Sequence, residues 1–380
     1  MIIRLGALGD VVRTLPALRQ IRRHYPRARI SWLVESKAAA VVRTEPAIDE
    51  VIVFPRGEWV ALMRRGRMLA VLGRAARFVR ELRGRRFDLA LDFHAILKSG
   101  LLSALSGAPV RVSYARPWGR EGVWWLANRR VTLTTRRCSR FDRNAGLVRF
   151  LGIEADGGAY RLPIELALRD HFERALAPQA APLVIHPGSS SSTPYKRYTA
   201  EGYAAVARAL AESEGLPCIV TSGPMREERA AAEAVVAAAG GAALHAPSTP
   251  TFAHLAALLS CCRVFVGSDS GPLHVASLVG TPVVQILGPT HPIENEPYRL
   301  TPYRVVRVPV SCSPCRRGCA SATCMRLVRP RSIVEAARQL LAVSPGDGRI
   351  MGRAEVAAPP SSALGSRLGT APSCLRTGPS

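Results

Sequence analysis

The stretch Val264-Phe265-Val266-Gly267-Ser268-Asp269-Ser270-Gly271-Pro272-Leu273-His274 is the part of the sequence that decides the fold. It is typical of a buried strand, a tight turn that contains glycine, and the start of a helix. In open α/β sheets, ligands bind outside the carboxyl ends of the strands, and the N–H groups of a new helix N-terminus suit a pyrophosphate. The stretch therefore predicts a phosphate-binding turn in an α/β domain.

Two residues of this turn, Asp269 and Ser270, have a simpler explanation, since both residue types cap helices. However, His274 lies on the first turn of the same helix, and the segments 280–282 (Gly-Thr-Pro) and 288–290 (Gly-Pro-Thr) follow. This combination exceeds what capping requires, and we interpret the turn as a ligand site.

Strands and helices alternate outward from this stretch. Short apolar runs predict strands at 2–5, 30–34, 51–54, 89–91, 110–113, 183–185, 218–221, 264–266 and 283–287. Apolar residues at helical spacing lie between many of these runs, as in Val11, Leu15, Leu18 and Ile21. Such alternation indicates parallel sheets covered on both faces, and 380 residues are enough for two sizeable cores.

The fold class predicted is therefore α/β, with two doubly wound domains facing each other across a cleft. We place the N-terminal domain at residues 1–165 and the C-terminal domain at 180–343, with a linker at 164–182 that contains a helical segment. Residues 344–380 are rich in Ser, Pro, Gly and Ala without periodicity, which predicts a disordered tail.

A second loop in the C-terminal domain has the composition of a phosphate site. The strand at 183–185 runs into His186-Pro187-Gly188-Ser189-Ser190-Ser191-Ser192, and Lys196 and Arg197 follow. Small hydroxyl residues and cations after a strand suit a phosphate. A serine run is often only a flexible loop, but two such loops in one sheet favour a nucleotide site.

Together these motifs resemble those of glycosyltransferase family 9, the ADP-heptose:lipopolysaccharide heptosyltransferases. The resemblance includes the opening Gly6-Ala7-Leu8-Gly9-Asp10-Val11-Val12, the pair of segments Asp92-Phe93-His94 and Leu97-Lys98-Ser99, and both C-terminal loops. It covers about residues 1–340 in the expected order. It implies the glycosyltransferase B fold of two Rossmann-like domains, with the acceptor on the N-terminal domain and the nucleotide sugar on the C-terminal one.

The implied activity is the inverting transfer of a heptose from ADP-heptose to the inner core of lipopolysaccharide, with Kdo-lipid A or a heptosylated core as the phosphorylated glycolipid acceptor. By this resemblance Asp10 is the catalytic base, although the same residue could simply cap a helix. The residues implied on the donor side are Ser189, Ser190, Lys196, Glu227 (to the ribose), Asp269, Ser270, Gly271 and His274. Those implied on the acceptor side are Gly9, Asp92 and Lys98. His94 stands where the family more often has Gln.

No Asp-x-Asp metal motif occurs in the sequence, so we expect no required cofactor. Lys196 and helix dipoles would meet the charge of the leaving group instead. Four cysteines, Cys312, Cys315, Cys319 and Cys324, lie close enough in sequence for a structural zinc site, with reduced or paired thiols as the alternative. Similar clusters occur in family members, outside the sugar-transfer machinery.

The chain carries 52 Lys and Arg against 28 Asp and Glu, a net charge of +24. GC-rich codon usage explains part of this, and attraction to a polyanion could explain the rest. We expect no nucleic-acid partner, because no nucleic-acid-binding motif is present and the basic residues are not interleaved with aromatics. A basic nucleic-acid-binding protein, a metal-binding module, and a family 9 enzyme with another donor sugar or acceptor are the alternatives.

The Arg-dense segment 56–86 has an apolar stripe at Leu69, Leu72, Ala76, Val79 and Leu82, which predicts an amphipathic helix. Such a helix is often only a solvated face, but it could also contact an anionic lipid surface. Without a secretion signal or an apolar run of membrane-spanning length, the sequence predicts a cytoplasmic protein with peripheral contact with the inner membrane.

Overall fold

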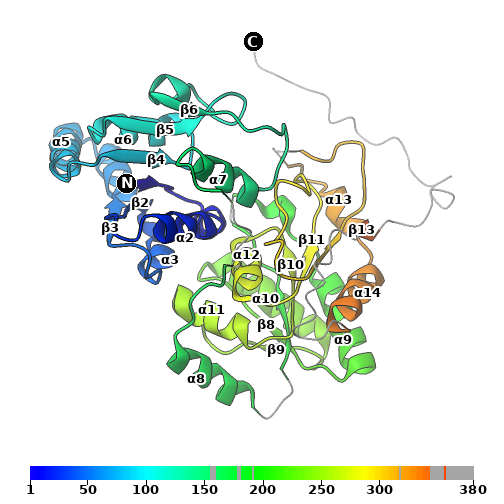
Figure 1. Ribbon diagram of the computed structural model, residues 1–380. Helices are drawn as coiled ribbons and strands as arrows, with labels where there is room; N and C mark the ends of the chain where they lie inside the picture. The colour runs from blue at the N-terminus through cyan, green and yellow to red at the C-terminus, as the bar shows by residue number, and fades with distance from the viewer. Residues whose placement is uncertain (155–159, 178–180, 191, 316–317, 343–354, 357–380) are drawn as a thin grey trace.

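The computed structural model describes residues 1–154, 160–177, 181–190, 192–315, 318–342 and 355–356. It consists of two parallel α/β domains packed against each other (Figure 1), the first coloured blue to green and the second green to orange. No helix in these residues is long and apolar enough to cross a membrane.

The N-terminal sheet has six parallel strands in the order β3-β2-β1-β4-β5-β6, which is the 3-2-1-4-5-6 order of the Rossmann fold. Its strands are β1 (Ile2–Ile3), β2 (Ser31–Glu35), β3 (Glu50–Phe54), β4 (Leu89–Asp92), β5 (Val110–Tyr114) and β6 (Arg129–Val131). Its helices are α1 (Leu8–Val12), α2 (Leu15–His24), η1 (Ser36–Ala38), α3 (Ala39–Arg43), α4 (Arg56–Arg64), α5 (Met68–Gly84), α6 (Leu97–Leu105), η2 (Val123–Trp125) and α7 (Arg140–Arg149).

The C-terminal sheet has seven parallel strands in the order β13-β12-β11-β10-β7-β8-β9, with the crossover again beside its first strand. Its strands are β7 (Leu183–His186), β8 (Cys218–Val220), β9 (Leu244–His245), β10 (Val264–Ser268), β11 (Val283–Ile286), β12 (Tyr303–Val306) and β13 (Glu355–Val356). Its helices are α8 (Leu166–Leu176), η3 (Pro194–Lys196), α9 (Ala200–Glu214), α10 (Arg226–Ala239), α11 (Phe252–Ser260), α12 (Gly271–Val279), α13 (Thr323–Arg326) and α14 (Pro330–Leu341). The predicted α/β class with two doubly wound domains is confirmed.

Two segments were predicted to lie outside the domain cores, the C-terminal tail and the linker between the domains. The predicted disordered tail, 344–380, lies outside the described residues except for Glu355–Val356, which form β13 beside β12. The helical segment of the predicted linker is α8, which packs against α11 and buries Phe172 completely. This part of the predicted linker is therefore packed structure.

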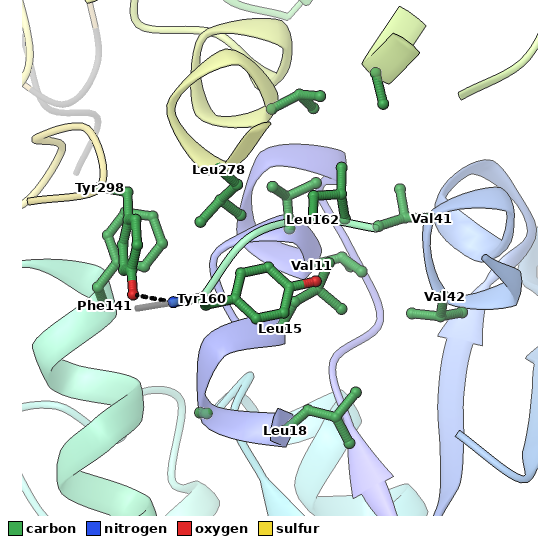
Figure 2. Close-up of a cluster of buried hydrophobic side chains, with 14 of the residues drawn as sticks. Val11, Leu15, Leu18, Val41, Val42, Phe141, Tyr160, Leu162, Leu278 and Tyr298 are labelled. Carbon is green, nitrogen blue, oxygen red and sulfur yellow. Dashed lines mark hydrogen bonds between the residues drawn. The ribbon is translucent and has the colours of Figure 1, made fainter. Parts of the chain in front are cut away.

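An apolar core joins the two domains (Figure 2). Val11 and Leu15, from α1 and α2, lie beside Leu278 of α12 and Leu162, which precedes α8. The N–H of Leu162 donates to the carbonyl of Leu278 (3.0 Å). Separating the domains would expose this surface to water, so hydrophobic burial stabilises their arrangement.

The predicted apolar stripe of α5 packs only at its C-terminal end. Leu69 and Leu72 are 85% and 61% exposed, whereas Leu82 of the stripe and Val71 outside it are buried. Phe78 decides the rotation of the helix, because its ring joins an edge-to-face cluster with Phe54 of β3 and Trp59 of α4. Burying that ring turns Leu69 and Leu72 to the surface.

Candidate functional site

A cavity of about 520 Å³ lies between the two domains. Its floor and walls come from both of them, as expected for ligands that bind at the carboxyl ends of parallel strands. The lining residues used below are Arg4, Asp10, His94, Trp118, Arg120, Arg137, Arg140, Arg143, Tyr195, Lys196, Thr290 and Glu294. Six of the lining side chains are Arg or Lys and two are carboxylates, so the cavity favours an anionic ligand.

Asp10, on α1, is surrounded by three arginines. Arg4 Nη2 lies 2.5 Å from Asp10 Oδ2, and Arg13 Nη2 and Arg140 Nη1 lie 2.8 Å and 2.5 Å from Oδ1. Burial by itself would raise the pKa of Asp10, but these cations outweigh it and hold the pKa well below its ordinary range. Asp10 is therefore an ionised carboxylate at the border of the two domains.

Asp269, at the end of β10, is the matching carboxylate of the C-terminal domain. Lys196 Nζ lies 2.8 Å from its Oδ2, and the hydroxyl of Thr290 donates to the same oxygen (3.2 Å). Burial acts to raise the pKa of Asp269, but His274, Lys196 and Arg13 lower it well below the ordinary value. This cluster unites three segments of the C-terminal domain that are distant in sequence.

His274, on the first turn of α12, is completely buried beside Asp269. Its Nε2 is 3.5 Å from Asp269 Oδ1, longer than a normal hydrogen bond, and neither ring nitrogen has a hydrogen-bond partner among the residues that the structure describes. Burial and the nearby Arg13 lower the pKa of His274 to about 4. The Ser270 hydroxyl, at the N-cap of the same helix, is likewise buried without a partner. Unpaired polar groups at the start of a helix are suited to a ligand with negative oxygens.

The two domains meet at a contact between glycines beside these carboxylates. A Cβ on Gly9 would lie 3.3 Å from Cα of Gly271 and 3.4 Å from the ring of His274. Helices α1 and α12 therefore approach each other closely here, with Leu8 of α1 packed over Gly271.

Comparison with known proteins identifies this architecture. Residues 75–325 match Glycosyltransferase family 9 (heptosyltransferase). The chain belongs to glycosyltransferase family 9. Among its relatives is the lipopolysaccharide core heptosyltransferase OpsX of Haemophilus influenzae, 24% identical over 78% of this chain and 81% of the relative. Lipopolysaccharide heptosyltransferase 1 of Pseudomonas aeruginosa is 26% identical over 77% and 79%.

Solved structures share the fold. The Escherichia coli heptosyltransferase WaaC with ADP superposes with a TM-score of 0.71, covering 89% of this chain and 98% of WaaC at 19% identity. The Escherichia coli ADP-heptose LPS heptosyltransferase II gives a TM-score of 0.68, with 90% and 97% covered at 20% identity. The two-domain arrangement predicted from the resemblance to family 9 is thereby confirmed.

Of the family 9 residues predicted on the donor side, Lys196 lines the cavity, and Asp269, Ser270, Gly271 and His274 gather at the start of α12. The two serines lie differently. The Ser189 hydroxyl donates to the carbonyl of Thr193, and Ser190 pairs with the hydroxyl of Ser192. Neither serine is among the residues that line the cavity, so their hydroxyls shape the loop that presents Lys196.

The predicted ribose ligand, Glu227, is exposed on the first turn of α10. Its neighbour Glu228 instead lies over Gly223 and Gly188, at the carboxyl ends of β8 and β7, and accepts from the N–H of Met225 (3.3 Å). The sequence did not distinguish the two glutamates, because only the phase of the helix decides which one faces the sheet.

The predicted acceptor-side residues of the N-terminal domain are not cavity walls. Asp92 is buried and accepts from the N–H groups of His94 (2.9 Å) and Ala95 (3.0 Å) and from the Ser99 hydroxyl (2.8 Å). Lys98 forms an ion pair with Glu35. Asp92 and Lys98 therefore lie outside the cavity lining, because both side chains are bound to partners within the N-terminal domain. The hydrogen bonds of Asp92 hold the loop that carries His94 into the cavity.

Sequence reasoning did not single out the arginines that surround Asp10 and line the cavity: Arg4, Arg13, Arg120, Arg137, Arg140 and Arg143. In a chain with 52 basic residues, the one available signal was Arg4, a charged residue within an apolar strand. Burial lowers the pKa of His94 to about 3, with Arg4 adding to the effect, so its ring is neutral at physiological pH.

Across the described part of the chain, no three His, Cys, Asp or Glu side chains are arranged to hold a metal ion. Cys312, Cys315, Cys319 and Cys324 form no disulfide bond there, and the structural zinc site stays a prediction. The N–H of Cys315 and the Ser313 hydroxyl donate to the carbonyls of Pro289 and Gly288, which ties this loop to the cavity wall.

Proposed function

We propose that this protein is an inverting glycosyltransferase that transfers a heptose from ADP-heptose to an inner-core acceptor of lipopolysaccharide. The observation that carries the proposal is the interdomain cavity of a family 9 chain, with the Asp10 carboxylate on one side and Lys196 on the other. Behind Lys196, Asp269 and His274 complete the donor-side cluster. The names of its relatives, lipopolysaccharide heptosyltransferases, support the same reaction.

On the donor side, the diphosphate would lie at the N-terminus of α12. There the helix offers free N–H groups, and Lys196, Ser270 and His274 supply further donors. Glu228, at the ends of β7 and β8, is in position to accept from ribose hydroxyls, the part an acidic residue takes in Rossmann-like domains.

The reaction needs no metal ion in this proposal. As the bond between the anomeric carbon and the diphosphate breaks, negative charge grows on the leaving group. Lys196 and the dipole of α12 are placed to stabilise that charge. The sequence has no Asp-x-Asp motif that would suggest a different arrangement.

On the acceptor side, Asp10 would take the proton of the attacking hydroxyl while Arg120, Arg137, Arg140 and Arg143 bind negative groups of a phosphorylated glycolipid. Trp118, which also lines the cavity, offers an apolar face for a sugar ring. Concentration of positive charge in one cavity favours a small anionic substrate over a nucleic acid.

The acceptor is a lipid, and the N-terminal domain presents a surface that fits a membrane. Met63, Met68, Leu69 and Leu72 are exposed on α4 and α5 among Arg64, Arg65, Arg67 and Arg74. Apolar side chains mixed with cations are typical of helices that lie in an anionic membrane interface. We propose that these helices contact the inner face of the inner membrane, which places the enzyme in the cytoplasm.

A transfer assay tests the function. The purified protein is incubated with a deacylated Kdo-containing core oligosaccharide and either ADP-heptose or a UDP-hexose, and the product is identified by mass spectrometry. We expect a heptosylated product only with ADP-heptose. Transfer from the UDP-hexose but not from ADP-heptose would replace the proposal with a family 9 enzyme that uses a different donor. Transfer from neither donor would refute it.

A further inference from the structure

Arg140 differs from the other two arginines that bind Asp10. Its side chain is 36% exposed, against 9% for Arg4 and 7% for Arg13. Arg4 is also held by the carbonyl of Phe93 (2.7 Å), and Arg13 by that of Gly9 (3.1 Å). Arg140 can therefore leave Asp10 by a rotation of its own side chain, without unpacking of the core.

The position of Arg140 is not explained by helix stability. It is the first residue of α7, where the helix dipole opposes a positive charge. From this position it reaches across 130 residues of sequence to Asp10 Oδ1.

The arginines around Asp10 keep unpaired hydrogen-bond donors. Within the described residues, the buried atoms Arg4 Nε, Arg13 Nη1 and Arg143 Nε have no hydrogen-bond partner. The other charged or titratable groups that face this cluster are Asp269 and His274 from the C-terminal domain, His94 from the loop after β4, and Glu294 and Arg143. Unpaired guanidinium donors beside a cavity indicate that a bound anion completes the site.

We propose that Arg140 is an acceptor-dependent clamp on Asp10: it pairs with the carboxylate in the free enzyme and moves to a carboxylate of the acceptor when that substrate binds. This inference rests on the proposed role of Asp10 as the base. While three guanidinium groups hold both carboxylate oxygens, Asp10 has little affinity for a proton and is a weak base. Departure of Arg140 removes one of the two guanidinium groups on Oδ1, while Arg13 stays, so the proton affinity of Asp10 rises when the acceptor hydroxyl arrives.

The step is balanced. The acceptor oxygen forms a bond to the anomeric carbon while the bond from that carbon to the ADP oxygen breaks, and the hydroxyl proton passes to Asp10 Oδ1. The electron pair of the broken bond leaves with ADP. Arg140 binds the anionic group of the acceptor and takes no part in proton transfer. It makes Asp10 a stronger base by leaving it, so Arg140 is a positioning residue.

The test compares two acceptors on four enzymes. The acceptors are the deacylated Kdo-containing oligosaccharide and its methyl ester, which has lost the carboxylate charges but keeps the phosphates and hydroxyls. The enzymes are the wild type, Arg140→Gln, Arg140→Lys and Arg120→Gln. The last removes an equal charge from the same cavity and lies outside the ion pairs that Asp10 forms with described residues. Steady-state kcat and KM are measured with ADP-heptose at neutral pH.

For the wild type we expect esterification to lower kcat by about tenfold, within the roughly 10²–10⁴-fold that general base catalysis contributes, because Arg140 then stays on Asp10. In Arg140→Gln the kcat should differ by less than about twofold between the acceptors, since the clamp is absent in both cases. Arg120→Gln should raise KM yet keep the wild-type ratio of kcat values, and Arg140→Lys should restore the ratio in part.

Equal kcat values for both acceptors in the wild type, or an unchanged ratio in Arg140→Gln, would overturn the clamp. These results differ from a failure of the proposed function. Without heptose transfer by any of the enzymes the function itself is refuted, and near-normal kcat in Asp10→Asn refutes the base on which the clamp depends. Binding of ADP by each variant, measured by calorimetry, establishes that the protein is folded.

Discussion

Gly9 and Gly271 lie in direct contact across the domain boundary, with the start of α1 against the start of α12. A Cβ on Gly9 would meet the backbone of Gly271 at 3.3 Å, and backbone cannot rotate away as a side chain can. The distance between the Asp10 and Asp269 clusters is thus set by two residues without side chains.

The first prediction follows from this contact. Gly9→Val should force the domains apart and lower kcat/KM by about a hundredfold, the loss that a displacement of about 1 Å can cause. Binding of ADP should stay within about twofold, because its site is in the C-terminal domain. Gly57→Val, on α4 with open space around its Cα, is the control and should transfer normally. Normal transfer by Gly9→Val would show that the contact does not set the geometry.

The second prediction concerns Lys196. Lys196→Ala removes a charge-assisted contact to the diphosphate and leaves Asp269 with less compensation, so ADP affinity should fall by about 1.5–3 kcal/mol, roughly ten- to a hundredfold. Isothermal titration calorimetry measures this directly. Lys37→Ala, exposed on η1, is the matched control. Unchanged ADP affinity in a folded Lys196→Ala protein would remove Lys196 from the donor site.

The third prediction tests Asp10 as the base. Asp10 lies within α1, whose N-cap is Ala7, so its carboxylate does not cap that helix. Asn takes no proton, so Asp10→Asn should keep ADP binding while turnover falls by roughly 10²-fold or more. Asn also loses the electrostatic attraction of three arginines. The melting temperature of the variant, measured in parallel, therefore shows how far the substitution lowers stability. Near-normal turnover would direct the search for a base to His94.

The fourth prediction is a pH dependence of stability from Asp92. Burial raises the pKa of Asp92 to about 6, in spite of the hydrogen bonds it accepts from Ala95, Ser99 and His94. Between its unfolded pKa of about 4 and this value, the folded state holds the proton more tightly, so the Asp92 contribution to stability declines as pH rises. From pH 4 to pH 7 the loss is on the order of 2–3 kcal/mol.

Urea unfolding at pH 4, 5.5 and 7 checks the sign. The unfolding free energy of Asp92→Asn should improve relative to wild type as pH rises, since Asn has no proton to lose. Asp170→Asn, exposed on α8, should follow the wild type throughout. If the difference in unfolding free energy between Asp92→Asn and the wild type is the same at all three pH values, Asp92 does not titrate in this range.

The fifth prediction concerns the surface of α5. Replacing Leu69 and Leu72 by Ser should weaken co-sedimentation with vesicles that contain anionic lipid, with little effect on stability because both side chains are exposed. Binding should also weaken with salt, as screening reduces an attraction of about 1 kcal/mol per basic residue. If co-sedimentation with vesicles does not change with lipid charge, with salt or with this double substitution, α5 does not contact the membrane.

The sequence predicted the architecture and the principal motifs well, because these depend on local order. Strand, turn and helix in the stretch Val264–His274 are encoded in adjacent residues, and the same is true of the opening that contains Gly9 and Asp10. The sequence predicted less well which side chains pack beside those motifs. The choice between Glu227 and Glu228, and between the two faces of α5, depends on how a helix rotates about its axis when it packs.

By itself, then, the sequence determined two doubly wound domains and two carboxylates at strand–helix turns, since hydrophobic periodicity and turn residues act over a few positions of the chain. Only the tertiary structure decided which of the chain's many arginines control Asp10. Arg4, Arg13 and Arg140 come from a strand end, a helix end and a helix that begins 130 residues after Asp10. Their shared effect on one carboxylate arises from distances of 2.5–2.8 Å in space, because a Coulomb interaction depends on separation in space and not on separation along the chain.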